Sequence, residues 1–346
     1  MKNLCYIALV VLIVSCSTGN QNSYVCENVK YITEFQKEIE LPLKNPEKIC
    51  LNGCLDIFNV DSLLICKMQG GDYFWKVYNL NNNGFLGSLL RKGHAENEFI
   101  EMPVSEKSVV TDSALYCDFW NYYAKEWISC NLTASLAKKS LVCTSKRKVR
   151  SEDEFHKLFM LSDSSFFGMR NNHSFGNVRG ILHEGNFEEL NNIGNLNTLT
   201  AKQDLNLLSA NLCVNTQREM VAEAMLRLNQ INLYSLRNTE SVTLCMDENL
   251  QDVVDVESMP EKLRKKYFGS IRAYKDYFVA LYYDSKLVDF FTGNSKSTYL
   301  LFFGWNGLPL QKIKVQFLVT NFFIYNNQLY LFSTQEEKEM LYKYDL

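Results

Sequence analysis

Short apolar runs, separated by polar turn residues, follow one another along the chain from Ile32 to its end. The runs are rich in Val, Ile, Leu, Tyr and Phe and are broken by Asn, Asp, Gly and Ser, a pattern typical of β-strands joined by tight turns. Three runs open with Asp-Ser, at positions 61, 112 and 163, so that the spacing is 51 residues both times. Looser counterparts begin at Thr216, Lys275 and Asn326. Repeats of this length with several short strands predict the blades of a β-propeller.

Six copies of the repeat predict an all-β fold, a six-bladed β-propeller that occupies residues 32–346 as one domain. The predicted blades are 42–102, 103–150, 151–200, 201–255, 268–316 and 317–346. The last unit contains only three strands, and we expect Phe35–Leu41, within residues 32–41, to supply the fourth strand and close the ring. Closure is needed because an unpaired edge at the seam would invite aggregation.

Two stretches depart from the strand pattern. Arg218–Leu228 contains good helix formers such as Glu, Ala, Met and Leu, but its place in the repeat predicts a strand. Residues 247–267 lengthen the fifth unit, and Pro260 precedes a polar run there. We expect a short surface helix in this segment, on one rim of the ring.

The N-terminus has the features of an export signal. Lys2 precedes an apolar run from Leu4 to Val14, which fits a signal peptide over residues 1–15 and is too short to span a bilayer. The tetrad that ends in Cys16 resembles a bacterial lipobox, which implies acylation of Cys16 and a stable membrane anchor. An ordinary signal peptide with a chance Cys is the alternative. Residues 16–31 are predicted to be the lipidated Cys and a polar tether, and the lack of an acid before Glu27 favours the periplasmic face of the outer membrane.

The stretch 87–99, GSLLRKGHAENEF, resembles the signature of TolB-like six-bladed propeller lipoproteins of Bacteroidetes. Gly93, Glu98 and Phe99 match that signature, whereas residues 94–97 lack its usual Gly-Pro core. The strand KDYFVALYYDSK, residues 275–286, is similar to the penultimate-blade strand of the same family. The resemblance implies a propeller fold and an envelope lipoprotein, and it implies no enzymatic activity.

The same stretch has two interpretations at the level of its residues. In the structural one, Gly93 adopts a positive φ in the turn, Glu98 accepts hydrogen bonds from loop amides and Phe99 packs between blades. In the functional one, polar side chains of this stretch line a binding rim, together with an aromatic patch on neighbouring hairpins that would stack on sugars or bind a protein. The candidate rim residues are Arg91, Lys92, His94, Glu98, Trp75 and Trp120. Packing between blades is the alternative role for the two tryptophans.

Composition and motifs exclude several functions. The formal net charge is −3, with 36 basic and 39 acidic residues, and the basic residues form no wide face of the kind that nucleic-acid binding requires. The four His are not spaced as metal ligands, and no catalytic or nucleotide-binding motif occurs, so we expect no metal, no cofactor and no enzymatic activity. Apart from Cys5 and Cys16, nine of the 11 Cys remain, and we expect them to be mostly buried free thiols.

These observations favour a lipid-anchored binding or scaffolding module of the cell envelope, with a protein or glycan partner. One alternative is a metal-dependent hydrolase of the lactonase kind, which would use inward-facing residues such as Asp56, Asn59 and Asn321. Another is an envelope sensor that signals to a partner protein. Ser62 and Ser113 follow Asp and precede aliphatic residues, a pattern that matches O-glycosylation sites in such bacteria.

Overall fold

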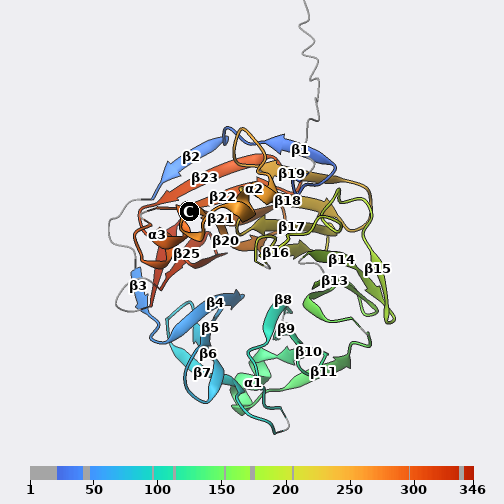
Figure 1. Cartoon of the computed structure of the whole chain (residues 1–346). Helices are drawn as coiled ribbons and strands as arrows, with labels where there is room; N and C mark the ends of the chain where they lie inside the picture. The colour runs from blue at the N-terminus through green and yellow to red at the C-terminus, as the bar shows by residue number, and fades with distance from the viewer. Residues whose placement is uncertain are drawn as a thin grey trace, which may run out of the picture.

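The computed structural model describes residues 22–41, 47–95, 97–111, 114–151, 153–171, 176–204, 206–295, 297–334 and 339–346, with the backbone alone at 47–48 and 104–110. Its strands form six sheets that stand around a central axis (Figure 1). The fold is therefore a six-bladed β-propeller, as the repeat predicts.

Each blade is an antiparallel meander in chain order. The first three blades contain β4 (Cys54–Val60), β5 (Leu63–Met68), β6 (Tyr73–Asn79) and β7 (Phe85–Arg91); β8 (Val104–Val110), β9 (Leu115–Asn121), β10 (Glu126–Asn131) and β11 (Cys143–Lys148); and β12 (Phe155–Met160), β13 (Ser165–Asn171), β14 (Asn177–His183) and β15 (Asn186–Glu189). The last three contain β16 (Ala210–Asn215), β17 (Met220–Met225), β18 (Gln230–Ser235) and β19 (Ser241–Cys245); β20 (Lys265–Ala273), β21 (Tyr277–Lys286), β22 (Thr298–Gly304) and β23 (Pro309–Val315); and β24 (Asn321–Tyr325), β25 (Gln328–Ser333) and β26 (Met340–Asp345).

The first strand of each blade is the innermost one. Contacts join β24 to β4, β4 to β8, β8 to β12, β16 to β20 and β20 to β24, so these strands surround the axis. Side chains that alternate along them point in turn toward the two neighbouring blades. On β4, Ile57 lies in the core shared with blade six, and Phe58 lies in the core shared with blade two. The apolar cores lie between adjacent blades.

The N-terminal segment runs along the outside of three blades, as Figure 1 shows. Strand β1 (Asn28–Tyr31) pairs in parallel with β19, β2 (Lys37–Glu40) pairs in parallel with β23, and β3 (Glu47–Cys50) pairs antiparallel with β26. An N-terminal strand thus completes the last blade, but it is β3, and the prediction that Phe35–Leu41 does so is wrong. The same pairing removes β3 from the first blade, where the predicted range 42–102 places it.

The alternative position of β2 has an electrostatic reason. The outer strand of blade five presents Lys312 and Lys314, and the parallel register sets Glu38 and Glu40 beside them. The ion pairs are 3.5 Å for Glu38–Lys312 and 3.1 Å for Glu40–Lys314. Leu41 is buried at the end of this strand, in the core shared by blades five and six. Charge complementarity, backbone pairing along β2 and the apolar contacts of Ile39 and Leu41 together favour blade five.

Short helices occur only in connections among the described residues. They are α1 (Leu132–Lys138) in blade two, α2 (Val253–Ser258) and η1 (Glu261–Leu263) between blades four and five, and α3 (Leu287–Phe291) in blade five. The helix expected within residues 247–267 is thus present, and the strand predicted in Arg218–Leu228 is β17. No helix in the described part of the chain is long and apolar enough to cross a membrane.

Candidate ligand pocket on the ring axis

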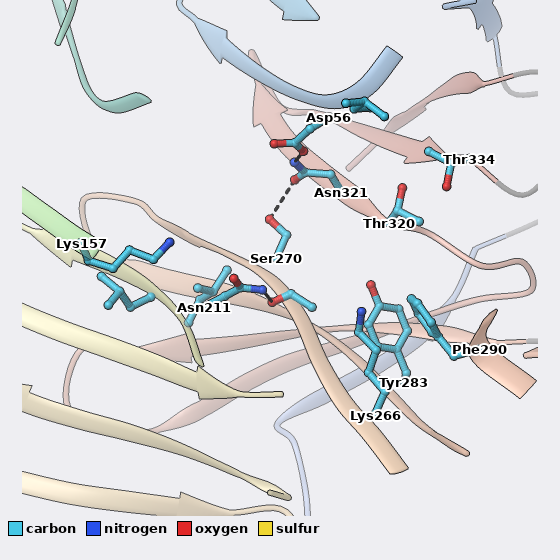
Figure 2. Close-up of a pocket in the computed structure, with 14 residues that line it drawn as sticks. Asp56, Lys157, Asn211, Lys266, Ser270, Tyr283, Phe290, Thr320, Asn321 and Thr334 are labelled. Carbon is cyan, nitrogen blue, oxygen red and sulfur yellow. Dashed lines mark hydrogen bonds between the residues drawn. The ribbon is translucent and has the colours of Figure 1, made fainter. Parts of the chain in front are cut away.

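A pocket of about 440 Å³ lies where the innermost strands meet. Its lining comes from five of the six blades, because β4, β12, β16 and β20 and the start of β24 each contribute side chains (Figure 2). The polar members are Asp56, Lys157, Asn211, Lys266, Ser270, Tyr283, Thr320, Asn321 and Thr334. The volume falls in the range of about 300–1,000 Å³ that is typical of small-molecule sites.

Asp56 and Asn321 meet in this pocket, although they are 265 positions apart in the sequence. The Asn321 amide donates to the Asp56 carboxylate and, at 2.9 Å, to the Ile57 carbonyl. Ser270 in turn donates to the Asn321 side-chain oxygen at 2.8 Å, as Figure 2 shows. Asn59 lies elsewhere, since its amide donates to the Asp61 carbonyl at 3.2 Å in the turn after β4. Two of the three inward residues proposed from the sequence therefore converge.

The charge of Asp56 is already matched within the protein. Lys67 donates to its carboxylate at 2.8 Å, and Arg272 stands nearby, with its guanidinium on the Asn321 oxygen at 3.0 Å. Burial alone would raise the pKa of Asp56, but the charges of Lys67 and Arg272 and the Asn321 hydrogen bond hold it below its usual value. Asp56 is thus an anion with two cations beside it. No group of three or more His, Cys, Asp or Glu that could hold a metal occurs among the described residues.

Lys266 is positioned by aromatic rings. Its ammonium lies 3.9 Å from the ring centroid of Phe290 on α3 and 5.5 Å from that of Tyr283 on β21, and these cation–π contacts stabilise the charge without neutralising it. Burial, with a smaller effect of Arg227, lowers the pKa of Lys266 to about 8. Helix α3 contacts η1, β20 and β21, so the inserted segments of blade five hold this wall of the pocket.

The rim residues predicted from the sequence lie in a different place, between blades one and two. Glu98 accepts a hydrogen bond from the Ala95 amide at 3.0 Å and lies 3.5 Å from the Arg91 guanidinium. Gly93 has φ +150°, and a Cβ there would collide with the Glu98 carboxylate. The Lys92 ammonium donates to the Gln69 carbonyl at 3.0 Å. The loop is thus held by its own polar contacts.

The other members of the loop complete this description. Phe99 is buried, with its ring 5.7 Å from that of Phe119 in blade two. His94 is exposed. The buried ring of Phe99 therefore joins the loop after blade one to the core of blade two.

The proposed aromatic patch is contradicted by burial. Trp75 is 0% exposed and Trp120 is 3% exposed, so neither can stack on a ligand at the surface. Trp75 packs edge-on against Phe58 and Phe119 at 5.4 and 5.6 Å, and Trp120 donates to the Phe155 carbonyl of blade three at 3.3 Å. The two side chains are large and apolar, and they fill the interfaces between consecutive blades.

The nine cysteines in the described residues are free thiols, and seven of them are buried. Cys117, Cys130 and Cys143 lie opposite one another on three adjacent strands of blade two. Burial raises the pKa of Cys26 to about 12, which is typical of an inert core thiol. Cys16 and Ser113 lie outside the described residues, and Ser62 lies in the turn between β4 and β5.

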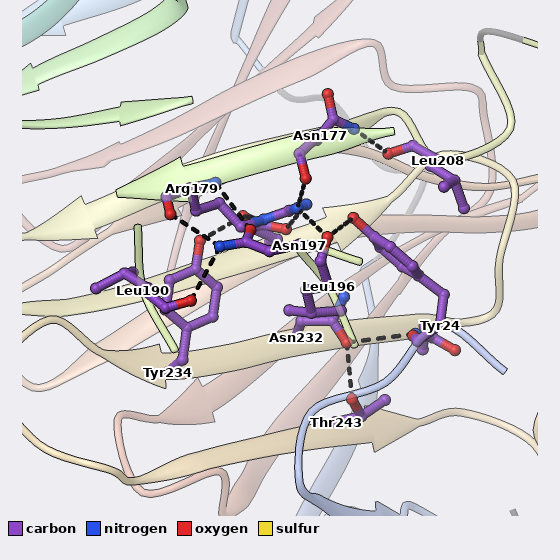
Figure 3. Close-up of polar contacts among 12 residues, drawn as sticks. Tyr24, Asn177, Arg179, Leu190, Leu196, Asn197, Leu208, Asn232, Tyr234 and Thr243 are labelled. Carbon is purple, nitrogen blue, oxygen red and sulfur yellow. Dashed lines mark hydrogen bonds and ion pairs between the residues drawn. The ribbon is translucent and has the colours of Figure 1, made fainter. Parts of the chain in front are cut away.

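A second polar cluster lies between blades three and four, and Figure 3 shows its contacts. Arg179 on β14 and Glu223 on β17 form a two-pronged ion pair at 2.8 and 2.9 Å, and both side chains are 0% exposed. Arg179 also donates to the Leu196 carbonyl at 2.6 Å. Burial would lower the pKa of Arg179, but Glu223 and Tyr24 raise it well above its ordinary value, so the guanidinium stays charged.

This cluster also binds the N-terminal segment. The Tyr24 hydroxyl donates to the Leu196 carbonyl at 3.0 Å, and its ring lies 5.5 Å from the Arg179 guanidinium. The Val25 amide donates to the Asn195 side chain at 2.8 Å. Tyr24 and Val25 lie within the range 16–31 that was predicted to be a tether. The prediction is wrong for the second half of this range, because buried side chains and strand β1 fix it to the ring.

The sequence contained a signal for the axial pocket that the search for motifs missed. Lys157, Asn211 and Ser270 each stand within the first strand of a repeat, where an inward polar side chain breaks an apolar run. Aligning the six repeats on their first strands would have brought these positions together. Tyr283 and Phe290 carry no such signal, because α3 is an insertion in one blade.

Comparisons with known proteins found similarity in structure and none in sequence. No protein-family model matches the sequence, and no curated protein matches it significantly. A member of the DUF4221 family from Bacteroides vulgatus has a similar structure, with a TM-score of 0.50 and 10% identity over 88% of this chain and 100% of that chain. A Bacteroides fragilis protein described provisionally as exported has a TM-score of 0.47 and 9% identity, over 89% of this chain and 99% of that chain. A luciferin-regenerating enzyme has a TM-score of 0.46 and 7% identity, over 87% of this chain and 96% of that chain. At 10% identity the first of these likenesses supports the fold alone, and the TolB-like resemblance stays a prediction.

Proposed function

We propose that the protein is a binding module of the cell envelope, lipid-anchored through Cys16, that holds a small polar ligand in the pocket on the ring axis. The observation that carries the proposal is the convergence of polar side chains from five blades on one pocket of about 440 Å³. A rigid ring presents such groups in a fixed geometry, and ligand sites typically combine a few convergent polar groups with apolar walls. The apolar part of this lining comes from Leu55, Leu212, Ile271 and Phe290.

The test is a thermal-shift screen of residues 17–346 against neutral and acidic sugars, lactones and divalent cations. A ligand at a hundred times its Kd adds about 2.7 kcal/mol to the free energy of unfolding. Leu55→Trp would fill the pocket, because Leu55 lines it and is 50% exposed. Leu86→Trp is the matched control, since Leu86 is 43% exposed on β7 and is not part of the lining. A ligand response that Leu55→Trp abolishes and Leu86→Trp retains is expected; equal responses in both variants would refute the pocket.

A separate measurement addresses the anchor. In a cell that performs lipoprotein processing, the wild-type chain should fractionate with membranes and incorporate a labelled acyl chain. Cys16→Ser should appear in the soluble fraction, because the acyl chains supply the membrane affinity. Membrane retention of Cys16→Ser would count against a lipid anchor.

One observation favours the hydrolase as a second candidate, namely the meeting of Asp56 and Asn321 on the axis. Lys67 and Arg272 occupy the neighbourhood of that carboxylate, however, and they supply the positive charge that a metal would supply. The divalent-cation arm of the screen decides between the candidates. A stabilisation by calcium that Asp56→Asn removes would support the hydrolase.

A further inference from the structure

The axial pocket has an excess of positive charge. Lys157 and Lys266 both line it, and Asp56 is the only acid among the described lining residues. Asp56 already has Lys67 at 2.8 Å. Within the described residues, neither Lys157 nor Lys266 has a carboxylate within ion-pair distance. Two ammonium groups therefore face the pocket without an anionic partner.

The surroundings of Lys266 strengthen this imbalance. Its ammonium is held against Phe290 at 3.9 Å, in a partly buried position where the charged form is costly. The nearest charged influence on it is Arg227, another cation, and one guanidinium nitrogen of Arg227 is itself buried with no hydrogen-bond partner in the described structure. On its own strand the neighbouring Lys265 pairs with Asp284 at 2.7 Å, so that carboxylate is engaged elsewhere. An incoming anion would offset the cost of keeping Lys266 charged.

The remaining polar groups complement hydroxyls. Ser270 uses its proton on Asn321, which leaves its oxygen free to accept, and Thr320 donates to the Phe332 carbonyl at 3.2 Å. The Asn211 amide donates to the Gly269 carbonyl at 2.9 Å, so its side-chain oxygen can accept as well. Figure 2 shows these groups around the same space as the two lysines. The ring of Phe290 adds an apolar surface for a sugar-sized carbon skeleton.

We propose that the axial pocket binds a small polyhydroxylated anion, a sugar-sized molecule bearing a carboxylate or a phosphate, and that Lys266 holds its acidic group. Lys157 stands on the opposite side of the pocket and adds to its positive potential, as Figure 2 shows. This inference rests on the proposed function, because it takes the pocket to be the binding site. A lysine that donates to an anion forms a charge-assisted hydrogen bond. Loss of one such bond should weaken binding by about 10- to 100-fold.

The test is isothermal titration of the protein with glucuronate, glucose 6-phosphate and glucose. These probes share one sugar ring and differ in the acidic group, so the first two distinguish a carboxylate from a phosphate. Lys157→Met and Lys266→Met remove each charge but keep a chain of similar length, and Lys138→Met is the control, because Lys138 is exposed at the end of α1. Circular dichroism and the melting midpoint establish that each variant folds.

We expect at least one acidic probe to bind at least tenfold more tightly than glucose, with the difference lost in Lys266→Met, reduced in Lys157→Met and kept in Lys138→Met. Glucose that binds as well as the acids, and that Leu55→Trp excludes, would overturn the anion proposal and leave the pocket as a binding site. Acidic probes whose binding Leu55→Trp does not affect would overturn both proposals. The anion proposal would also be overturned if none of the three probes binds at 10 mM, because a specific small-ligand site should have a Kd below roughly this concentration.

Discussion

The buried ion pair between Arg179 and Glu223 should be the most sensitive electrostatic contact in the described part of the ring. Arg179→Met removes the cation and leaves the Glu223 carboxylate in a position that is 0% exposed. Removal of one partner from a buried pair costs about 3–5 kcal/mol, because the remaining charge has lost its compensation. The Leu196 carbonyl, which accepts from Arg179 at 2.6 Å, also loses a donor.

The magnitude can be converted into a melting temperature. Unfolding entropy is about 2.1 cal/mol/K per residue, which for a propeller of this length gives roughly 0.7 kcal/mol/K. A loss of about 4 kcal/mol therefore lowers Tm by about 6 °C. Differential scanning calorimetry at pH 7 measures this shift directly. Arg218→Met is the matched control, because Arg218 pairs with Asp276 at 2.9 Å on the exposed surface, where an ion pair contributes about 0–1 kcal/mol.

A double variant tests the physical reason behind this prediction. Arg179→Met with Glu223→Leu removes both charges, so no uncompensated ion remains. The double variant should therefore be more stable than Arg179→Met alone. It should still be less stable than the wild type, because the Tyr234 hydroxyl, which donates to Glu223, loses its acceptor. A Tm for Arg179→Met within 1 °C of the wild type, or a double variant as unstable as the sum of both single variants, would refute the argument.

Three further outcomes follow from other contacts. Tyr24→Phe should lower stability by about 1 kcal/mol in chemical unfolding, because it loses the hydrogen bond to Leu196; no change would show that the bond contributes nothing. Gly194→Ala should cost about 1–3 kcal/mol and increase proteolysis near Val25, since Gly194 has φ +64° and a Cβ would collide with the Val25 carbonyl; unchanged cleavage would contradict this close approach. Affinity for an acidic probe should decrease as pH rises through about 8, the pKa of Lys266, because the lysine then loses the charge that holds the anion; a flat profile between pH 6 and 9, about one or two units either side, would speak against that role.

The sequence was sufficient for the blades because each repeat contains the information for its own strands. Asp-Ser turns and apolar runs fix local pairing, so the strand in Arg218–Leu228 could be assigned against its helix propensity. The ring closure depends on which outer edge accepts each N-terminal strand. The pairs of Glu38 and Glu40 with Lys312 and Lys314 contribute to this choice, and they join segments some 270 residues apart, so no local pattern records it.

The candidate site was predicted less completely for a related reason. Aromatic residues attracted a functional interpretation, yet Trp75 and Trp120 are consumed by packing between blades. Asp56 and Asn321 were recognised as inward-facing, but their convergence depends on the closed ring, which brings the first and last blades together. Lys157 and Lys266 were not among the candidate residues, because a single strand does not show which of its side chains reach the pocket on the axis.

The two groups of cations in the ring differ in a way that bears on function. Arg179 is buried, and its guanidinium donates hydrogen bonds to the Glu223 carboxylate and to a backbone carbonyl. These acceptors stabilise the buried charge. Lys266 is partly buried as well, but its contacts are aromatic rings, and the charged group that acts on it is another cation. A fold can satisfy a charge that serves only stability by placing a carboxylate beside it, as it does for Arg179. The excess of positive charge in the axial pocket is therefore better explained by an anion that comes from outside the chain.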